Sequence, residues 1–144
     1  MNKVYIAGPF FDAHQLRVIK NIEHTLEKAD IEYFSPRILG NISDNKGNAE
    51  FAEKIFDANI NGILHNNCTL VVIDGFDPGT MVELGYAYSI KRIIPSSRRI
   101  ITYSAKDYGL NVMLAQMSDC HVTDINNLVD AIKGDYHNKA ESTT

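Results

Sequence analysis

The fold is decided by residues 68–87, which read CTLVVIDGFDPGTMVELGYA. The apolar run at residues 68–73 predicts a buried strand, and a helix is expected to begin near Gly79. Asp77 lies between the two elements, and Glu83 lies on the first turns of the helix. Ligands of open α/β sheets bind beyond the carboxyl ends of the strands. A buried strand followed by a turn with one carboxylate and a helix with a second carboxylate therefore indicates a functional site rather than packing alone.

Strand-like and helix-like segments alternate along the rest of the chain. Strands are expected at residues 4–7, 31–34, 69–73, 99–103 and 120–122, and helices at residues 12–28, 49–64, 79–91, 111–116 and 124–133. This alternation predicts an α/β fold in which a parallel sheet is covered by helices on both faces. Residues 1–134 are expected to form a single domain, residues 37–48 a surface loop, and residues 135–144 a polar, flexible tail.

Composition excludes several classes of function. The formal net charge of -4 gives no basic surface for nucleic acid. The chain has no G-x-G-x-x-G, P-loop or G-x-S-x-G motif, which counts against dinucleotide cofactors, nucleoside triphosphate hydrolysis and serine esterase chemistry. The N-terminus does not resemble a signal peptide, and no apolar run approaches the length of a membrane span. We therefore expect a cytoplasmic protein.

No metal site is expected from the cysteines or the histidines. Cys68 and Cys120 lie in predicted strands without a CxxC pair and are expected to be buried thiols. The histidines share no metal-ligand spacing, and each is expected at the surface or at a helix end: His14, His24, His65, His121 and His137.

Glu83 and Tyr5 are two of the candidates for chemistry. The dipole of a helix favours an ionised carboxylate near its N-terminus, and an ionised carboxylate can attack an electrophilic carbon. Simple complementation of the dipole is the alternative role for Glu83. Tyr5 lies in the strand at residues 4–7, and the strand at residues 69–73 is its expected neighbour. One expectation is that the Tyr5 hydroxyl hydrogen-bonds a carboxylate beside that strand. The alternative is that the Tyr5 side chain only packs in the core.

Two further segments carry candidate binding residues. Gly8 permits close backbone approach after the first strand, and Phe10 and Phe11 either line a pocket or pack in the core. Asn111 would open a short helix, where its residue type favours an N-cap.

Three blocks of the sequence, at residues 5–11, 77–87 and 110–113, together resemble the nucleoside 2-deoxyribosyltransferase family. The resemblance covers nearly the whole chain. It implies a flavodoxin-like, doubly wound sheet of five parallel strands and a homo-oligomer built from dimers. It also implies cleavage of the N-glycosidic bond of 2'-deoxynucleosides and transfer of the sugar to another nucleobase, without a cofactor, in nucleotide salvage.

The resemblance also implies roles for individual residues. Glu83 would attack the anomeric carbon and form a deoxyribosyl-enzyme ester, and Tyr5 would hydrogen-bond this carboxylate. Asp77 would help to hold the nucleoside. Asn111 would reach the neighbouring subunit's site and bind the 5'-hydroxyl of the sugar, in place of a capping role. The other expected substrate-binding residues are Asn59, Gly8, Phe10, Phe11, Gly79 and Met113.

The chain departs from the family pattern in two places. Asn59 stands where the family usually has an aspartate that protonates or hydrogen-bonds the leaving base, and an amide carries no titratable proton. The tail ends in Thr144, where many members have an aromatic residue. Two other readings therefore stay open: a deoxynucleoside 5'-monophosphate N-hydrolase, and a non-catalytic nucleoside- or nucleotide-binding module.

Overall fold

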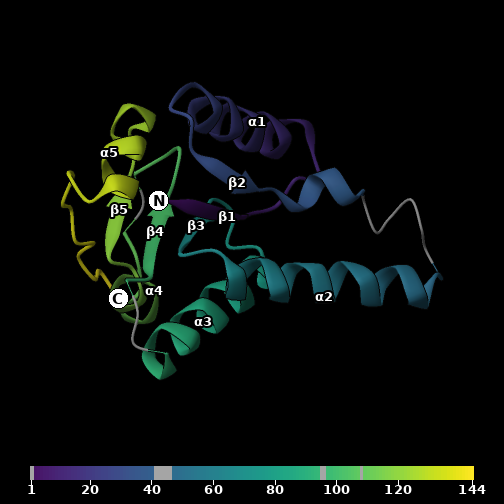
Figure 1. Ribbon diagram of the computed structural model, residues 1–144. Coiled ribbons are helices and arrows are strands. Elements are labelled where there is room, and N and C mark those ends of the chain that lie inside the picture. The colour runs from purple at the N-terminus through teal and green to yellow at the C-terminus, as the bar shows by residue number, and fades with distance from the viewer. Residues whose placement is uncertain (1, 41–46, 95–96, 108) are drawn as a thin grey trace.

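The computed structural model describes residues 2–40, 47–94, 97–107 and 109–144 (Figure 1). The elements, in chain order, are β1 (Lys3–Ala7), α1 (Ala13–Lys28), β2 (Glu32–Phe34), the 3-10 helix η1 (Pro36–Leu39), α2 (Ala49–His65), β3 (Cys68–Val72), α3 (Pro78–Ile93), β4 (Arg99–Tyr103), α4 (Val112–Met117), β5 (Cys120–Val122), the 3-10 helix η3 (Ile125–Asn127) and α5 (Leu128–Lys133). None of the helices in these ranges is long and apolar enough to cross a membrane.

The sheet has five parallel strands in the order β2-β1-β3-β4-β5. This confirms the predicted single-domain α/β fold with a flavodoxin-like, doubly wound sheet. Because the chain leaves β1 toward β2 and then crosses back to β3, the loops that follow β1 and β3 diverge at their carboxyl ends. Such a switch point is where open α/β sheets bind ligands, and the loop after β3 carries Asp77.

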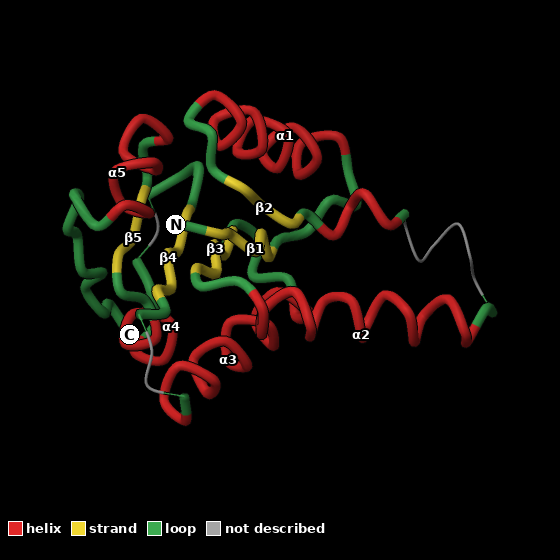
Figure 2. Tube along the Cα trace, in the orientation of Figure 1, coloured by secondary structure: helices red, strands yellow, loops and turns green. Residues whose placement is uncertain are grey.

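Alternate residues of each strand face opposite layers of helices. Val4 and Ile6 of β1 pack in a core under α1 and α5, whereas Tyr5 and Ala7 pack in a second core under α2, α3 and α4. The two layers of helices are visible on either side of the strands in Figure 2. The side on which Tyr5 packs is therefore also the side on which α3 carries Glu83.

The predicted element boundaries need two corrections. The expected loop at residues 37–48 begins as the 3-10 helix η1, and its residues 41–46 lie outside the described residues. The expected helix at residues 124–133 is divided, because the Asp124 side chain accepts a hydrogen bond from the Asn126 amide and closes the tighter turn of η3 before α5 begins. Residue 1 of the predicted domain is likewise outside the described residues.

Buried side chains confirm one prediction and correct another. Cys68 and Cys120 are buried free thiols, as expected. His121 is not a surface residue: β5 carries it into the interior, where it is 5% exposed. Its Nδ1 lies 2.8 Å from the hydroxyl of Thr102. Burial lowers the pKa of His121, so the imidazole is neutral in the folded protein at neutral pH.

The tail at residues 135–144 lies against the body of the protein rather than detached from it. Backbone hydrogen bonds join Asn138 to β5 and Thr143 to Leu110. The sequence alone had suggested no partners for this polar segment. Its expected flexibility stays a prediction.

Candidate active site

A hydrogen bond between Tyr5 and Glu83 lies at the centre of the candidate site. The Tyr5 hydroxyl donates to Glu83 Oε2 over 2.6 Å and joins β1 to α3 across 78 positions of the chain. This is the contact expected from the parallel neighbours β1 and β3. The bond is present in the structure, and the catalytic roles of the two residues stay predictions.

Tight packing determines where the Tyr5 hydroxyl lies. The side chain is fully buried, and its ring stacks on Phe34 with the centroids 5.8 Å apart and the planes at 14°. Gly62 of α2 lies on the ring as well, since a Cβ at this position would be 2.7 Å from Tyr5 Cδ2. A ring enclosed in this way holds its hydroxyl at one point, which is where Glu83 accepts the hydrogen bond.

Glu83 is a partly buried carboxyl group that ionises near neutral pH. Burial raises its pKa to about 7, and the nearby Asp77 carboxylate acts in the same direction, whereas the hydrogen bond from Tyr5 lowers it. We expected the helix dipole to favour the ionised form, and the net direction of the pKa shift is the opposite. Glu83 lies in the second turn of α3, where the dipole has weakened, so desolvation dominates.

Asp77 is both the N-cap of α3 and a wall of the site. Its Oδ2 accepts hydrogen bonds of 2.9 Å from the amide and from the hydroxyl of Thr80. Pro78 follows at the first helical position, where its missing N–H costs nothing. The cap holds the Asp77 carboxylate close enough to Glu83 to influence its ionisation.

Seven of the predicted site residues line one cavity of about 200 Å³ at the carboxyl edge of the sheet. They are Gly8, Phe10, Phe11, Asn59, Asp77, Gly79 and Glu83. Phe10 and Phe11 are neighbours there, with ring centroids 5.3 Å apart. Phe11 is 59% exposed. These observations favour a role in lining the cavity for Phe10 and Phe11 over core packing alone.

Sequence reasoning did not single out Pro36, Gly40, Ile55 and Thr80, which also line this cavity. Ile55 could have been found from its spacing, because it precedes Asn59 by four residues on the same face of α2. Pro36 and Gly40 carry no such local signal, since they reach the cavity through the turn of η1.

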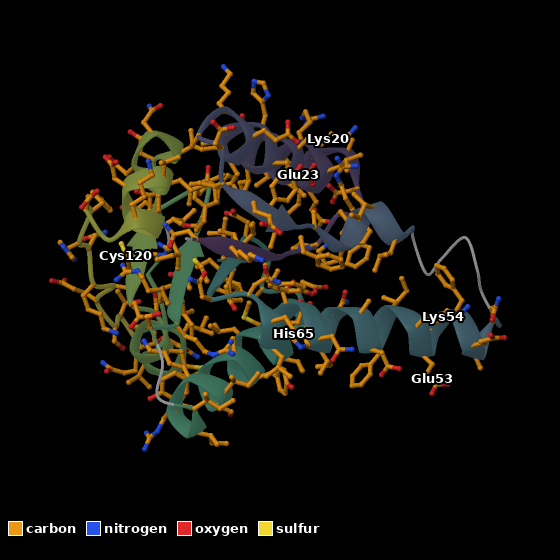
Figure 3. All side chains as sticks on the ribbon, viewed as in Figure 1. Lys20, Glu23, Glu53, Lys54, His65 and Cys120 are labelled. Atoms are coloured by element: carbon orange, nitrogen blue, oxygen red, sulfur yellow. The ribbon has the colours of Figure 1, made fainter. Side chains whose placement is uncertain are left out.

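A buried ion pair holds η1 in place. Glu23 of α1 is 3% exposed, and Figure 3 shows it on the side of α1 that faces the sheet. Arg37 donates to both of its carboxylate oxygens, over 2.7 Å from Nε and through a second, shorter hydrogen bond. Ser35 adds a third hydrogen bond of 2.7 Å. Two-point pairing of this kind is directional, so it orients the turn that carries Pro36 and Gly40 to the cavity.

Asn59 has a buried oxygen that lacks a partner. Its Oδ1 is enclosed and accepts no hydrogen bond from the described residues. A buried polar atom without a partner costs free energy, which a ligand donor would recover. This atom lies on the cavity that also holds Glu83 and Asp77.

Asn111 and Met113 do not join the cavity of their own chain. Asn111 caps α4, and its Oδ1 accepts a hydrogen bond of 3.0 Å from the Leu114 amide. It lines a separate cavity of about 480 Å³ that also includes Phe76. Met113 is 59% exposed. The N-cap role is thus present in the structure, and a role in the site of a neighbouring subunit stays a prediction.

Comparisons with known proteins agree on the fold. Residues 4–127 match the model of a family described as nucleoside 2-deoxyribosyltransferase. No curated protein matches the chain in sequence. Among solved structures, a 2-deoxyribosyltransferase from the psychrotolerant bacterium Bacillus psychrosaccharolyticus is 26% identical, with a TM-score of 0.76 over 88% of this chain and 89% of that one.

Two further solved structures share the fold at lower identity. A conserved protein from Enterococcus faecalis V583 is 21% identical, with a TM-score of 0.72 over 94% of this chain and 99% of that one. A CMP N-glycosidase from Clostridium botulinum is 14% identical, with a TM-score of 0.55 over 91% of this chain and 97% of that one.

Proposed function

The chain belongs to the nucleoside 2-deoxyribosyltransferase family, and we propose that it transfers 2-deoxyribose between nucleobases through a covalent intermediate on Glu83. Membership indicates deoxyribosyl transfer or a related N-glycosidase activity. The observation that carries the finer proposal is the pair of Tyr5 and Glu83. A half-buried carboxyl group, held by a hydrogen bond of 2.6 Å beside a cavity, is suited to attack on a sugar carbon. Such a reaction would serve nucleotide salvage in the cytoplasm.

The proposed reaction has two displacements at the anomeric carbon. Glu83 Oε1 forms a bond to this carbon while the bond to the departing base breaks, and the base leaves with the bonding electrons. The positive charge that develops on the sugar is stabilised by the carboxylate, as in retaining glycosidases. The released base takes up a proton from water. A nitrogen of the incoming base then attacks the same carbon and loses its proton to water, and Glu83 leaves as a carboxylate. Tyr5 holds Oε2 throughout.

Asn59 and Asp77 are the proposed partners of the nucleoside. The unpartnered Oδ1 of Asn59 can accept a hydrogen bond from an N–H group of a base, and its amide can donate one to a ring nitrogen. Such an amide supports departure of the base by hydrogen bonding without proton transfer. Asp77 is positioned by its capping bonds to Thr80 and would hold the bound nucleoside, with Phe10 and Phe11 against the flat base.

The charges around the cavity favour a nucleoside over a nucleotide. The described lining residues include two acidic side chains, Asp77 and Glu83, and no lysine, arginine or histidine. A phosphate at the 5' position would be repelled by this wall. Arg37, a residue of η1, is engaged with Glu23. The monophosphate hydrolase is therefore the second candidate.

Exposed apolar side chains support a homo-oligomer. Val82 is 68% exposed, and Phe76, Val112 and Met113 are exposed as well. We propose that a dimer covers such residues and brings Asn111 to the site of the neighbouring subunit. Mixing the inactive variant Glu83→Gln with Asn111→Ala, which should bind deoxynucleosides more weakly, tests this arrangement. Recovery of activity in the mixture supports shared sites, and no recovery after subunit exchange contradicts them.

Product analysis tests the proposed reaction. The protein is incubated with deoxyinosine alone and with added adenine. Deoxyadenosine formed only with adenine supports transfer, whereas hypoxanthine released equally in both reactions indicates hydrolysis. Incubation with a 2'-fluoro-2'-deoxynucleoside, followed by intact-mass measurement, tests for an ester on Glu83. The Glu83→Gln variant should lack both the product and the adduct.

A matched substitution controls for general effects of charge loss. Glu53 lies on α2 and points away from the sheet in Figure 3, and its side chain is exposed. Glu53→Gln should keep full activity. A Glu83→Ala variant with unchanged transfer would refute the proposed nucleophile, and tight nucleoside binding without any product would support the binding module.

A further inference from the structure

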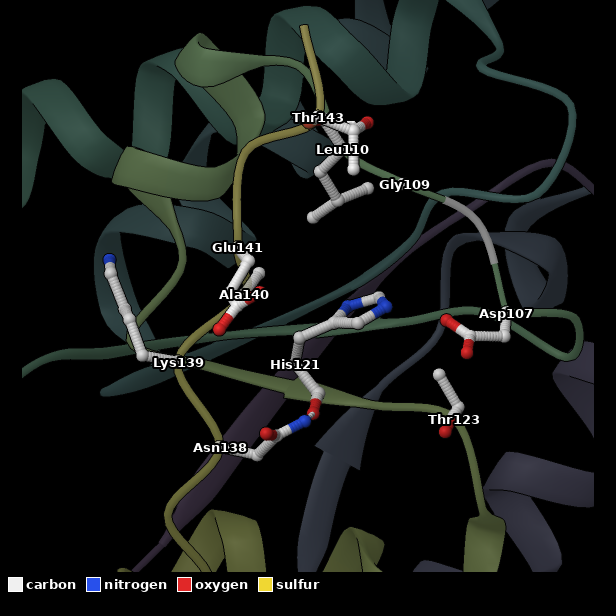
Figure 4. A pocket seen from close by; sticks show the side chains of 10 residues that line it. All are labelled: Asp107, Gly109, Leu110, His121, Thr123, Asn138, Lys139, Ala140, Glu141 and Thr143. Atoms are coloured by element: carbon white, nitrogen blue, oxygen red, sulfur yellow. Dashed lines mark hydrogen bonds between the residues drawn. The ribbon is translucent and has the colours of Figure 1, made fainter.

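The C-terminal tail binds back onto the edge of the sheet. The amide of His121 in edge strand β5 donates a hydrogen bond of 2.8 Å to the Asn138 carbonyl oxygen. The Asn138 side-chain amide donates one of 2.9 Å to the His121 carbonyl oxygen, and Figure 4 shows the two residues side by side. The backbone amide and carbonyl of His121 are thus both hydrogen-bonded, at a strand edge that would otherwise be open. We name residues 138–144 the C-terminal strap.

Lys139 joins the strap to the C-terminal end of α4. Its Nζ donates hydrogen bonds to the carbonyl oxygens of Gln116 and Ser118. The last carbonyls of a helix have no partner within the helix, and a positive charge suits the negative end of the helix dipole. The strap therefore completes this end of α4.

The last two residues of the strap bind the first residue of α4 and the chain just before it. The Thr143 amide donates a hydrogen bond of 2.9 Å to the Leu110 carbonyl oxygen, and the Val112 amide donates one of 2.8 Å to the Thr144 carbonyl oxygen. These two bonds lie on either side of Asn111 in the chain.

Gly109 makes the close approach of the strap possible. A Cβ at this position would lie 2.2 Å from the Thr143 hydroxyl oxygen, a distance at which one of the two segments must move. Thr143 lies against Leu110 and Gly109 in Figure 4. A glycine here allows the strap to reach the Leu110 carbonyl.

We propose that the C-terminal strap positions Asn111 for substrate binding. The helix α4 has only six residues, and a helix of this length is not stable by itself. Its packing on the core through Ala115, together with the contacts at both of its ends, therefore determines where Asn111 lies. Because Oδ1 of Asn111 accepts from Leu114, its side-chain nitrogen is the group left to donate to a ligand. This inference rests on the proposed function, in which that ligand is the 5'-hydroxyl of a deoxynucleoside.

A variant that ends at Glu141 removes the bonds of Thr143 and Thr144. We expect its KM for deoxyinosine to rise about three- to tenfold, the factor for one lost hydrogen bond, while kcat changes little. The same truncation should leave the KM for 2',5'-dideoxyinosine, which lacks the 5'-hydroxyl, unchanged. The truncation should also add nothing to the effect of Asn111→Ala. An equal loss on both substrates, or a full additional loss in the double variant, would overturn the proposal.

Two milder variants guard against a truncated protein that fails to fold. Lys139→Met removes the contact at the end of α4, and Lys133→Met on α5 is the matched control, with an exposed side chain outside the strap. We expect Lys139→Met to raise the KM for deoxyinosine but not the KM for 2',5'-dideoxyinosine. Lys133→Met should change neither KM. Equal behaviour of the two variants contradicts the proposal.

Hydrogen exchange tests the contact of the strap with α4 independently of the proposed function. In the full chain the Val112 amide donates a hydrogen bond to the Thr144 carbonyl oxygen. This amide should exchange faster in the variant that ends at Glu141. Unchanged exchange overturns the strap contact. Faster exchange in a protein that acts on no deoxynucleoside at all would uphold the contact and refute the proposed function.

Discussion

Replacing Glu83 with glutamine should stabilise the folded protein at alkaline pH while it abolishes activity. Glutamine keeps the size of the side chain and an oxygen that can accept the Tyr5 hydrogen bond. It removes the ionisation of a carboxyl group whose pKa burial raises from 4.5 to about 7. At about 1.4 kcal/mol per pKa unit, this corresponds to about 3 kcal/mol of unfolding free energy.

The sign of the effect follows from proton binding. Between pH 4.5 and about 7 the folded protein retains a proton on Glu83 that the unfolded chain has released. Stability therefore falls as the pH rises through this window. The free energy of unfolding of Glu83→Gln minus that of the natural protein should increase with pH and level off above pH 7.

Urea unfolding at a series of pH values from 5 to 9 measures this difference. Glu53→Gln, an exposed substitution on α2, is the control and should show no such trend. A difference for Glu83→Gln that is equal at pH 5 and pH 9 would refute the assignment of a raised pKa to Glu83. Such a result would also mean that the Glu83 carboxylate does not lower the stability of the natural protein, as active-site groups often do.

Three further substitutions test the site. Tyr5→Phe removes a hydrogen bond that lowers the pKa of Glu83, so the acidic limb of the kcat/KM profile should move to higher pH; an unmoved limb contradicts the coupling. Gly62→Ala would place a Cβ 2.7 Å from the Tyr5 ring, and we expect about 1–3 kcal/mol of destabilisation in urea unfolding together with reduced kcat; unchanged stability would show that the ring is not confined. Asn59→Asp adds a titratable acid at the cavity, so the kcat profile should gain an ionisation and departure of the base should accelerate at acidic pH by up to about 10²–10⁴-fold; a profile identical to that of the natural protein would exclude contact between this residue and the base.

Much of the site could be predicted because its parts are local. Asp77 and Gly79 lie on one turn between β3 and α3, and a strand that ends in such a turn presents them at the carboxyl edge of the sheet. The bond between Tyr5 and Glu83 was foreseeable for a related reason, since β1 and β3 are parallel neighbours. Hydrophobic periodicity located the strands and helices to within one or two residues, apart from the 3-10 helix η1 and the division of the last helix.

The sequence by itself therefore determined the order of the elements, the parallel sheet and the identity of the carboxylates at its edge. Only the tertiary structure decided the properties that depend on distant neighbours. The pKa of Glu83 rises because several elements together exclude water from it. His121 is buried where β5 enters the core. The strap meets the start of α4 partly through backbone hydrogen bonds, which depend little on residue type. The burial of an individual polar group and the backbone pairing of distant segments leave no local mark in a sequence, because both arise from contacts between segments that the folded chain alone brings together.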